Sequence, residues 1–213
     1  MNSVELFEQL DFQVNRQFEQ VIEDLSEQKF CIVDQFFSLE EVEILRTALL
    51  EKYEEDQFKK SAIGNKTNEA IEKTIRGDFI LWINEAEQNE TEKLFFTKIN
   101  ELVNYLNRTC FMGILHKEFH YAVYPKGTFY KRHLDTFQND SRRKLSMVCY
   151  FNDETWQKEN GGELVIYKEN TTEEIIYPMP GRMVIFESQF LEHEVKPVQF
   201  DKRLSITGWL KTR

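Results

Sequence analysis

A histidine and an aspartate stand two positions apart in the stretch FYKRHLDTFQND, where His133 precedes Asp135. Side chains at i and i+2 of a β-strand point to the same face, so these two groups can converge on one point. A further histidine, His193, lies far downstream in SQFLEHEVKPV. Two imidazoles and one carboxylate leave coordination positions open, as non-haem iron(II) oxygenases require, although such a triplet also occurs by chance. The other histidines, His116 and His120, are expected to be ordinary helix-end and strand residues.

An arginine further along supplies a second group that could do chemistry. The stretch KRLSITGWL alternates, so one face of the expected strand carries Arg203, Ser205, Thr207 and Trp209. Burying a guanidinium without a partner is costly, and a carboxylate would satisfy it through two parallel hydrogen bonds. A dicarboxylic keto acid that binds a metal at one end would present such a carboxylate. The alternative is an arginine at a strand end that pairs with a surface acid.

The first half of the chain reads as mainly helical. Apolar residues at three- and four-residue steps predict helices over 3–25 and 91–110. Between them, Ser38 followed by Glu41 forms a capping box that predicts the start of another helix. Short strand-like pieces, FCIVDQF and DFILWI, separate these helices.

From residue 117 the pattern changes to short runs rich in β-branched and aromatic residues. Turn signals separate the runs at 125–127, 160–162, 178–181 and 197–201. Helices first and then closely spaced strands predict an α+β fold whose core is a double-stranded β-helix, or jelly roll, with N-terminal supporting helices.

With 213 residues, the chain fits one domain. We expect residues 1–110 to give mainly helical support with the first strands, and residues 111–213 to form the jelly-roll core. Residues 57–77 are expected to be a mobile loop, because they combine lysines with Gly64 and asparagines.

The net charge of −10 argues against nucleic acid as a partner, yet two segments, 57–77 and 126–144, are basic. The simplest interpretation of the two segments is solvated loops. The three cysteines lie far apart and predict neither a disulfide framework nor a zinc site. No secretory signal and no run of about 18 apolar residues is visible, so the expectation is a cytoplasmic protein without a membrane span.

Taken together, these motifs resemble a known family. HLD, a distant His and RLSITGW resemble the iron(II)- and 2-oxoglutarate-dependent oxygenases of the prolyl 4-hydroxylase type. YAVYPKGTFYKRHLDT, YFNDETWQKENGGELVIY and EAIEKTIRGDFILWI are similar to segments of the hydroxylases that act on hypoxia-inducible factor and of their bacterial relatives. The resemblance covers roughly residues 30–213.

The resemblance implies that His133, Asp135 and His193 hold Fe(II). It implies that Arg203 binds the distal carboxylate of 2-oxoglutarate, which is the co-substrate together with O2, and ascorbate is a candidate reductant. The resemblance also implies that Tyr124 binds the co-substrate through a hydroxyl hydrogen bond and that Thr207 makes a weaker polar contact with it. Some animal relatives have a second co-substrate tyrosine on the MVCYFN strand, and the resemblance places Cys149 there.

On the substrate side, the resemblance implies that Tyr130 and Trp209 line the pocket for a peptide proline, with Trp82 nearby. Arg76 and Asp78 would anchor the loop 57–77 over the substrate. Without the metal motif, Tyr124, Tyr130 and Trp209 would read as core aromatics.

The implied function is hydroxylation of a prolyl residue in a protein, with release of succinate and CO2. In bacterial relatives that protein is elongation factor Tu, in animals it is the hypoxia factor, and other relatives modify a ribosomal protein. The basic segments suit a proline-bearing peptide with acidic flanks. Two alternatives remain open: a hydroxylase of a free amino acid or other small molecule, and a non-catalytic metal-binding barrel.

Overall fold

The computed structural model describes residues 13–61, 75–136, 142–168 and 172–212. The described helices are α1 (Arg16–Gln28), α2 (Leu39–Glu54) and α3 (Glu90–Cys110), with two short 3-10 helices, η1 (Glu85–Glu87) and η2 (Lys158–Asn160). The described strands are β1 (Phe30–Val33), β2 (Lys59–Lys60), β3 (Phe79–Ile83), β4 (His116–Pro125), β5 (Tyr130–His133), β6 (Arg143–Tyr150), β7 (Leu164–Tyr167), β8 (Glu173–Ile176), β9 (Met183–Glu187), β10 (Glu192–Val195) and β11 (Lys202–Lys211). Helices therefore dominate the first half and strands the second, which confirms the α+β class.

The first helix starts later than its apolar periodicity predicts. Asn15 has an extended backbone, and its side chain accepts hydrogen bonds from the amides of Gln17 and Phe18, so it caps a helix that begins at Arg16. The predicted helix over 3–25 is therefore wrong at residues 13–15, and its first part lies outside the described residues.

The other two long helices begin at capping boxes. The Ser38–Glu41 box is present at the start of α2, as predicted, and an equivalent box joins Asn89 to Glu92 at the start of α3. Each helix turns one apolar face inward, and the described buried residues of α2 on this face are Val42, Leu45 and Leu49. In both helices the side chains of the box thus satisfy the backbone amides of the first residue before the helix and of the third residue within it.

The described strands form two antiparallel sheets. The larger has the order β1-β9-β6-β11-β4-β3-β2 and the smaller β5-β10-β7-β8. Strands from both halves of the chain build the larger sheet, because β1 pairs with β9 and β3 pairs with β4. The long strand β11 lies at its centre and pairs with β4 on one side and with β6 on the other.

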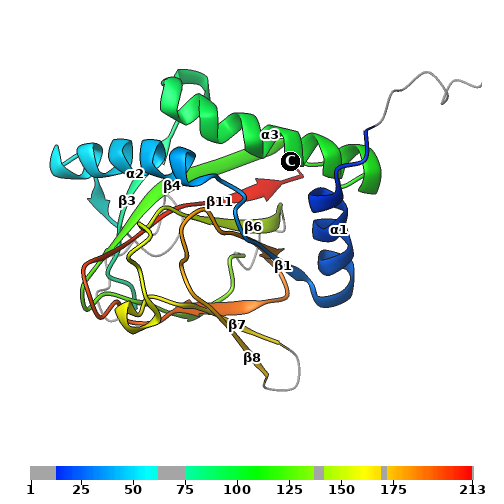
Figure 1. Cartoon of the computed structure of the whole chain (residues 1–213). Coiled ribbons are helices and arrows are strands. Elements are labelled where there is room, and N and C mark those ends of the chain that lie inside the picture. Colours follow the sequence, from blue (N-terminus) through cyan, green and yellow to red (C-terminus); the bar gives the residue numbers. More distant parts are fainter. Residues whose placement is uncertain (1–12, 62–74, 137–141, 169–171, 213) are drawn as a thin grey trace, which may run out of the picture.

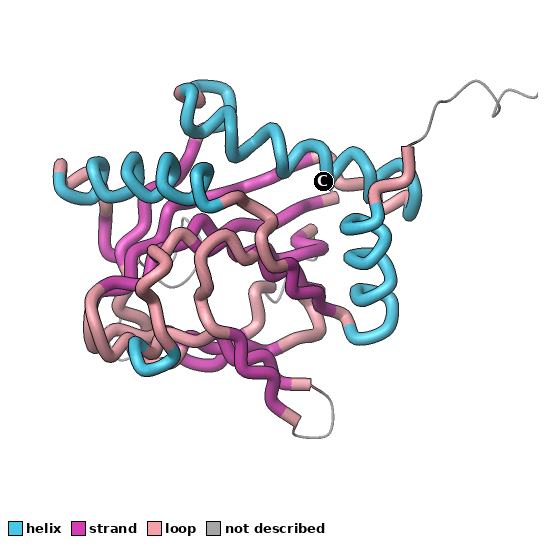
Figure 2. The backbone as a smooth tube through the Cα atoms, in the orientation of Figure 1, coloured by secondary structure: helices cyan, strands magenta, loops and turns pink. Residues whose placement is uncertain are grey.

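Each face of the larger sheet covers a separate apolar core. The helices α2 and α3 lie over one face, with α1 at its end, and the smaller sheet lies across the opposite face (Figure 1, Figure 2). The first core joins helix residues such as Leu45 and Phe95 to Ile206 of β11. The second lies between the two sheets and includes Tyr124, Val148 and Ile166. Functional side chains that point between the sheets therefore stand on a scaffold that is packed from behind.

Candidate metal centre

The three predicted metal ligands meet in space. One ligand atom from each of His133, Asp135 and His193 lies within 4.8 Å of the others. The two Nε2 atoms each lie 3.5 Å from a different oxygen of the Asp135 carboxylate. His133 and His193 are Cα partners across the β5–β10 pair, so the smaller sheet itself brings the imidazoles together.

The backbone fixes which nitrogen of each imidazole is available. Nδ1 of His133 lies 2.7 Å from the carbonyl oxygen of Lys131, and Nδ1 of His193 lies 3.3 Å from that of Leu191. A carbonyl can only accept, so Nδ1 carries the proton in both rings and Nε2 keeps its lone pair. Burial lowers the pKa of His193 to about 4, with the charge of Asp135 opposing this effect, so the ring is neutral at pH 7. Nε2 is therefore the atom that each ring offers to a metal.

Asp135 is buried and ionised. Burial alone would raise its pKa, but the charges that His193 and His133 carry when protonated, together with hydrogen bonds from His133 and Ser146, outweigh it, so the pKa lies far below the ordinary value for aspartate. Ser146 Oγ donates to Asp135 Oδ2 at 2.7 Å. A guanidinium nitrogen of Arg143 also donates to the Asp135 backbone carbonyl at 3.1 Å. The donor set of two imidazoles and a carboxylate fits iron(II).

The second predicted group, Arg203, is deeply buried between the sheets without an acid. It is 1% exposed, and no carboxylate of the described residues forms an ion pair with it. One guanidinium nitrogen donates to Ser205 Oγ at 3.2 Å, and Nε has no hydrogen-bond partner. The rings of Tyr124 and Tyr150 flank the guanidinium, each centroid 4.9 Å away. A buried cation with an unsatisfied donor fits the carboxylate of a dicarboxylic acid.

The tyrosine opposite Tyr124 corrects one expectation. The resemblance places Cys149 at the second co-substrate position, but Cys149 points into the core beneath the helices. The side chain beside Arg203 is that of Tyr150, one residue later, and its buried hydroxyl has no hydrogen-bond partner. Burial raises the pKa of both Tyr124 and Tyr150, so both phenols remain protonated and can donate. Thr207 follows on the same face of β11, with its hydroxyl 3.4 Å from that of Ser205.

Among the predicted substrate residues, Tyr130 lies directly against a candidate metal ligand, and Arg76 lies against Tyr130. The ring of Tyr130 stacks on His133 with a centroid distance of 3.7 Å, and the Arg76 guanidinium lies 4.2 Å from the centroid of Tyr130. Arg76 in turn binds Asp78 through two hydrogen bonds of 2.8 and 2.6 Å. The Asp78 carboxylate is fully buried and also accepts a bond of 2.9 Å from Ser61. The Arg76–Asp78 pair therefore fixes the end of segment 57–77 beside β5.

An aromatic cluster on strands β3, β4 and β11 contains two further predicted substrate residues, Trp82 and Trp209. The imidazole of His120 lies 4.9 Å from the ring of Trp82 and 5.5 Å from that of Trp209, and Arg143 stacks on Trp209 at 3.5 Å. His120 is a strand residue, as predicted, but it is buried and its Nδ1 has no hydrogen-bond partner. Burial, aided by the charge of Arg76, lowers its pKa to about 3. The position of His120 within this cluster was not predicted, because a histidine on a strand carries no sequence signal of its neighbours in space.

Most of the segment 57–77 cannot be compared with its prediction as a mobile loop, since residues 62–74 lie outside the described residues. Its start does differ from a loop, because Lys59 and Lys60 form strand β2 at the edge of the larger sheet. Both lysines are exposed, as are Lys126, Lys131 and Arg132 of the second basic segment. Exposed cations therefore occur in both basic segments, as predicted.

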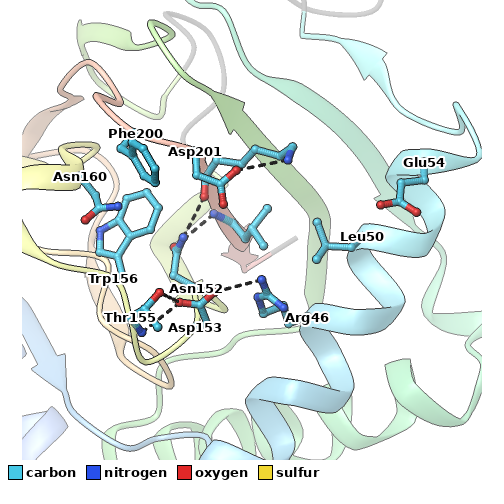
Figure 3. Close-up of a pocket in the computed structure, with 12 residues that line it drawn as sticks. Arg46, Leu50, Glu54, Asn152, Asp153, Thr155, Trp156, Asn160, Phe200 and Asp201 are labelled. Carbon is cyan, nitrogen blue, oxygen red and sulfur yellow. Dashed lines mark hydrogen bonds and ion pairs between the residues drawn. The ribbon is translucent and has the colours of Figure 1, made fainter.

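A separate hollow of about 140 Å³ lies elsewhere on the molecule, between α2, the loop after β6 and the start of β11 (Figure 3). Its lining includes Arg46, Asp153 and Phe200 but none of the predicted site residues. The Arg46–Asp153 ion pair at 3.1 Å crosses it. In the described part of the chain, no helix is both long and apolar enough to span a membrane.

Comparisons with known proteins agree with this geometry. A family model of the 2OG-Fe(II) oxygenase superfamily matches residues 119–211, which include His133, Asp135, His193 and Arg203. A prolyl 4-hydroxylase from Pseudomonas putida is 33% identical, with a TM-score of 0.82, and the match covers 92% of this chain and 99% of that one. A prolyl hydroxylase from Trichoplax adhaerens, solved with a hypoxia-inducible factor peptide, is 27% identical, with a TM-score of 0.83 and coverage of 92% and 90%.

A viral collagen prolyl hydroxylase from Paramecium Bursaria Chlorella virus-1 shares the fold at 18% identity and a TM-score of 0.63, with coverage of 88% and 98%. The jelly-roll prediction is thereby confirmed, as are the expected cofactors Fe(II), 2-oxoglutarate and O2. The chain belongs to the 2OG-Fe(II) oxygenase superfamily and is a dioxygenase with a prolyl 4-hydroxylase-like fold.

Proposed function

We propose that this dioxygenase hydroxylates a prolyl residue within a protein or peptide. The observation that carries the proposal is the stacking of Tyr130 on the candidate ligand His133, which sets an aromatic surface directly beside the metal centre. An apolar five-membered ring suits such a surface, and two solved structures that are 33% and 27% identical to this chain are both prolyl hydroxylases.

In this proposal, His133, Asp135 and His193 hold the metal. Arg203 binds the distal carboxylate of 2-oxoglutarate through its guanidinium, with phenol donors from Tyr124 and Tyr150. When bound, iron(II) with 2-oxoglutarate and O2 supplies the oxidant that inserts one oxygen atom into a C–H bond, with succinate and CO2 as the other products. The protein contributes fixed geometry and a site between two packed sheets that limits the access of water.

The flanks of the substrate are proposed to be acidic. Lys131, next to the metal ligands, and Lys59 and Lys60 at the sheet edge are exposed cations without an ion-pair partner among the described residues. Each exposed pair with an acidic peptide contributes only about 0–1 kcal/mol, so these charges guide selection and approach more than affinity. Affinity for an acidic peptide should therefore fall as salt is raised.

The test is mass spectrometry of proline-containing peptides after incubation with enzyme, Fe(II) and 2-oxoglutarate. We expect a gain of one oxygen atom on proline in a peptide with acidic flanks, coupled to succinate formation, and loss of both in Asp135→Ala. A matched peptide with basic flanks should be modified more slowly. Succinate formation coupled only to free amino acids would overturn the peptide proposal in favour of a small-molecule hydroxylase.

A further inference from the structure

The carboxylate of Asp135 is held by a line of two buried serines. Ser146 Oγ lies 2.7 Å from Asp135 Oδ2, and Ser188 Oγ lies 2.8 Å from Ser146 Oγ. Both serines are 0% exposed, and Asp135 is 9% exposed. Solvent therefore does not compete for these hydrogen bonds.

The direction of this hydrogen-bond line is fixed by the chemistry of its ends. Ser146 Oγ is the donor to Asp135 Oδ2, so the one hydroxyl proton of Ser146 points to Asp135. The oxygen of Ser146 then accepts the proton of Ser188. Both dipoles are aligned toward the negative charge, which strengthens each bond.

The larger sheet sets the positions of both serines. Ser146 lies on β6, and Ser188 directly follows the end of β9, its neighbour in the sheet. The ladder between these strands pairs Ser146 with Phe186, and the Ser188 amide donates to the Lys144 carbonyl at 3.2 Å. The serine hydroxyls thus belong to the rigid sheet, whereas Asp135 follows the end of the short strand β5.

We infer that Ser146 is a positioning residue for the metal centre, with Ser188 as its support. The bond from Ser146 occupies one lone pair of Oδ2 and stops rotation of the carboxylate between its two imidazole neighbours. Without it, the carboxylate can turn, and the ligand geometry offered to a divalent metal loosens. This inference rests on the proposed triad of His133, Asp135 and His193.

The experiment uses Co(II) as a probe on the full-length protein, with visible absorption reporting both affinity and ligand geometry. Loss of an outer hydrogen bond to a metal ligand costs about 10–100-fold in metal affinity, so we expect a weakening in this range for Ser146→Ala. We also expect changed band positions in its Co(II) spectrum. Ser188→Ala keeps the direct bond to Asp135 and should weaken Co(II) binding measurably, but by less than about tenfold.

Ser61→Ala is the matched control, because Ser61 is also a buried serine that donates to a buried carboxylate, that of Asp78, which is not a metal ligand. It should leave Co(II) affinity and spectrum unchanged. Urea unfolding of the metal-free variants identifies any variant that does not fold. If Ser146→Ala does not fold, Ser188→Ala provides the test. Wild-type Co(II) affinity in that variant would overturn the positioning role of the two serines.

The outcomes also distinguish the role of the two serines, called the serine relay, from that of the three candidate metal ligands. Wild-type affinity and spectrum in a folded Ser146→Ala, together with lost binding in His193→Ala, would reject the serine relay and keep the triad. Wild-type binding in His193→Ala as well would reject both.

Discussion

Two arginines lie near the candidate metal centre, and they are satisfied in different ways. Arg76 makes two hydrogen bonds to the buried carboxylate of Asp78, at 2.8 and 2.6 Å. Arg203 is more deeply buried, at 1% exposure, yet no carboxylate of the described residues pairs with it, and its Nε has no partner. The chain provides an internal acid at the first position and none at the second.

The difference follows from the cost of a buried charge. Removing a guanidinium from water costs several kcal/mol unless a paired and hydrogen-bonded anion offsets it. At Arg76 the anion of Asp78 offsets this cost within the folded chain. At Arg203, in the proposed function, the carboxylate of the bound co-substrate offsets it. The first arginine is therefore expected to matter for stability and the second for the co-substrate.

The largest expected effect is on co-substrate affinity when Arg203 is removed. Arg203→Met should weaken 2-oxoglutarate binding by about 4 kcal/mol, roughly 1,000-fold in Kd, because a desolvated charge pair is lost. The free energy of unfolding should not fall, since the charge removed has no partner in the chain. Titration calorimetry of the Mn(II)-loaded protein under anaerobic conditions measures the Kd.

Lys202→Met is the matched control, because Lys202 is the preceding residue of β11 and pairs with surface Asp201 at 3.3 Å. It should leave the Kd unchanged. An unchanged Kd in Arg203→Met would contradict the assignment of the guanidinium to the co-substrate.

The opposite pattern is expected at the internal pair. Asp78→Asn leaves Arg76 buried without its anion and should lower the free energy of unfolding by about 3 kcal/mol, with little change in 2-oxoglutarate affinity. Burial opposes ionisation of Asp78, but Arg76 and Ser61 outweigh it, so its folded pKa is lowered. A lowered pKa contributes stability that is present above about pH 4, the unfolded value, and is lost as pH falls through the folded pKa.

Urea unfolding at pH 7 and at pH 3 measures this effect. The difference in the free energy of unfolding between wild type and Asp78→Asn should be constant above pH 5 and should become smaller in acid. Equal stability at pH 7 would show that the pair is not a structural ion pair.

A smaller effect concerns the pH dependence of stability that arises from His120, whose pKa the charge of Arg76 helps to lower. Burial and this charge lower the pKa of His120 to about 3, below an unfolded value near 6.5. Between these values the unfolded state binds one more proton, so stability falls by about 1.4 kcal/mol per pH unit on acidification, or about 2 kcal/mol from pH 6.5 to pH 5. His120→Phe should remove this part of the slope, and unfolding curves across that range measure it.

His193 contributes a similar slope, because its pKa is also lowered, to about 4, so His120→Phe should remove only part of the total. His116→Phe, an exposed histidine on the same strand β4, is the control and should leave the slope as it is. A full wild-type slope in His120→Phe would show that this ring is protonated in the folded protein.

The smallest expected effect concerns the phenol beside Arg203. Tyr150→Phe removes a hydroxyl proposed to donate to the co-substrate and should weaken 2-oxoglutarate binding by about 1 kcal/mol, or about fivefold. Cys149→Ala changes the neighbouring side chain, which points into the other core, and should reduce stability without affecting the Kd. The reverse result would restore the position that the sequence resemblance implies.

Much of the fold was predictable from local patterns. The Ser38–Glu41 capping box marks the start of α2, and the change from helical to strand periodicity near residue 117 coincides with β4. The start of α1 was not predicted, because apolar periodicity continues through residues at which Asn15 caps the helix. Side-chain capping is a local competition that the apolar pattern does not record.

The triad and Arg203 could be predicted because their residue types are costly to bury without a function. Tyr150 could not, because β6 is buried on both faces and its apolar residues do not alternate with polar ones. Where both faces are apolar, a pattern of period two does not say which side chain faces which core, and a one-residue error exchanges them. Ser146, a polar residue in this strand, was the available signal for the face of Tyr150.

The central strand β11 also fixes the distance between the two ends of the candidate site. It is paired along both edges, and its register with β6 sets Ser205 opposite Tyr150 and Trp209 opposite Ser146. The four residue steps from Tyr150, beside Arg203, to Ser146, beside Asp135, span about 13 Å of strand. Covalent geometry and the pairing of β11 with β4 and β6 fix this interval. The enzyme should therefore select its keto acid by length, and an acid one methylene shorter or longer should not reach both the metal centre and Arg203 well.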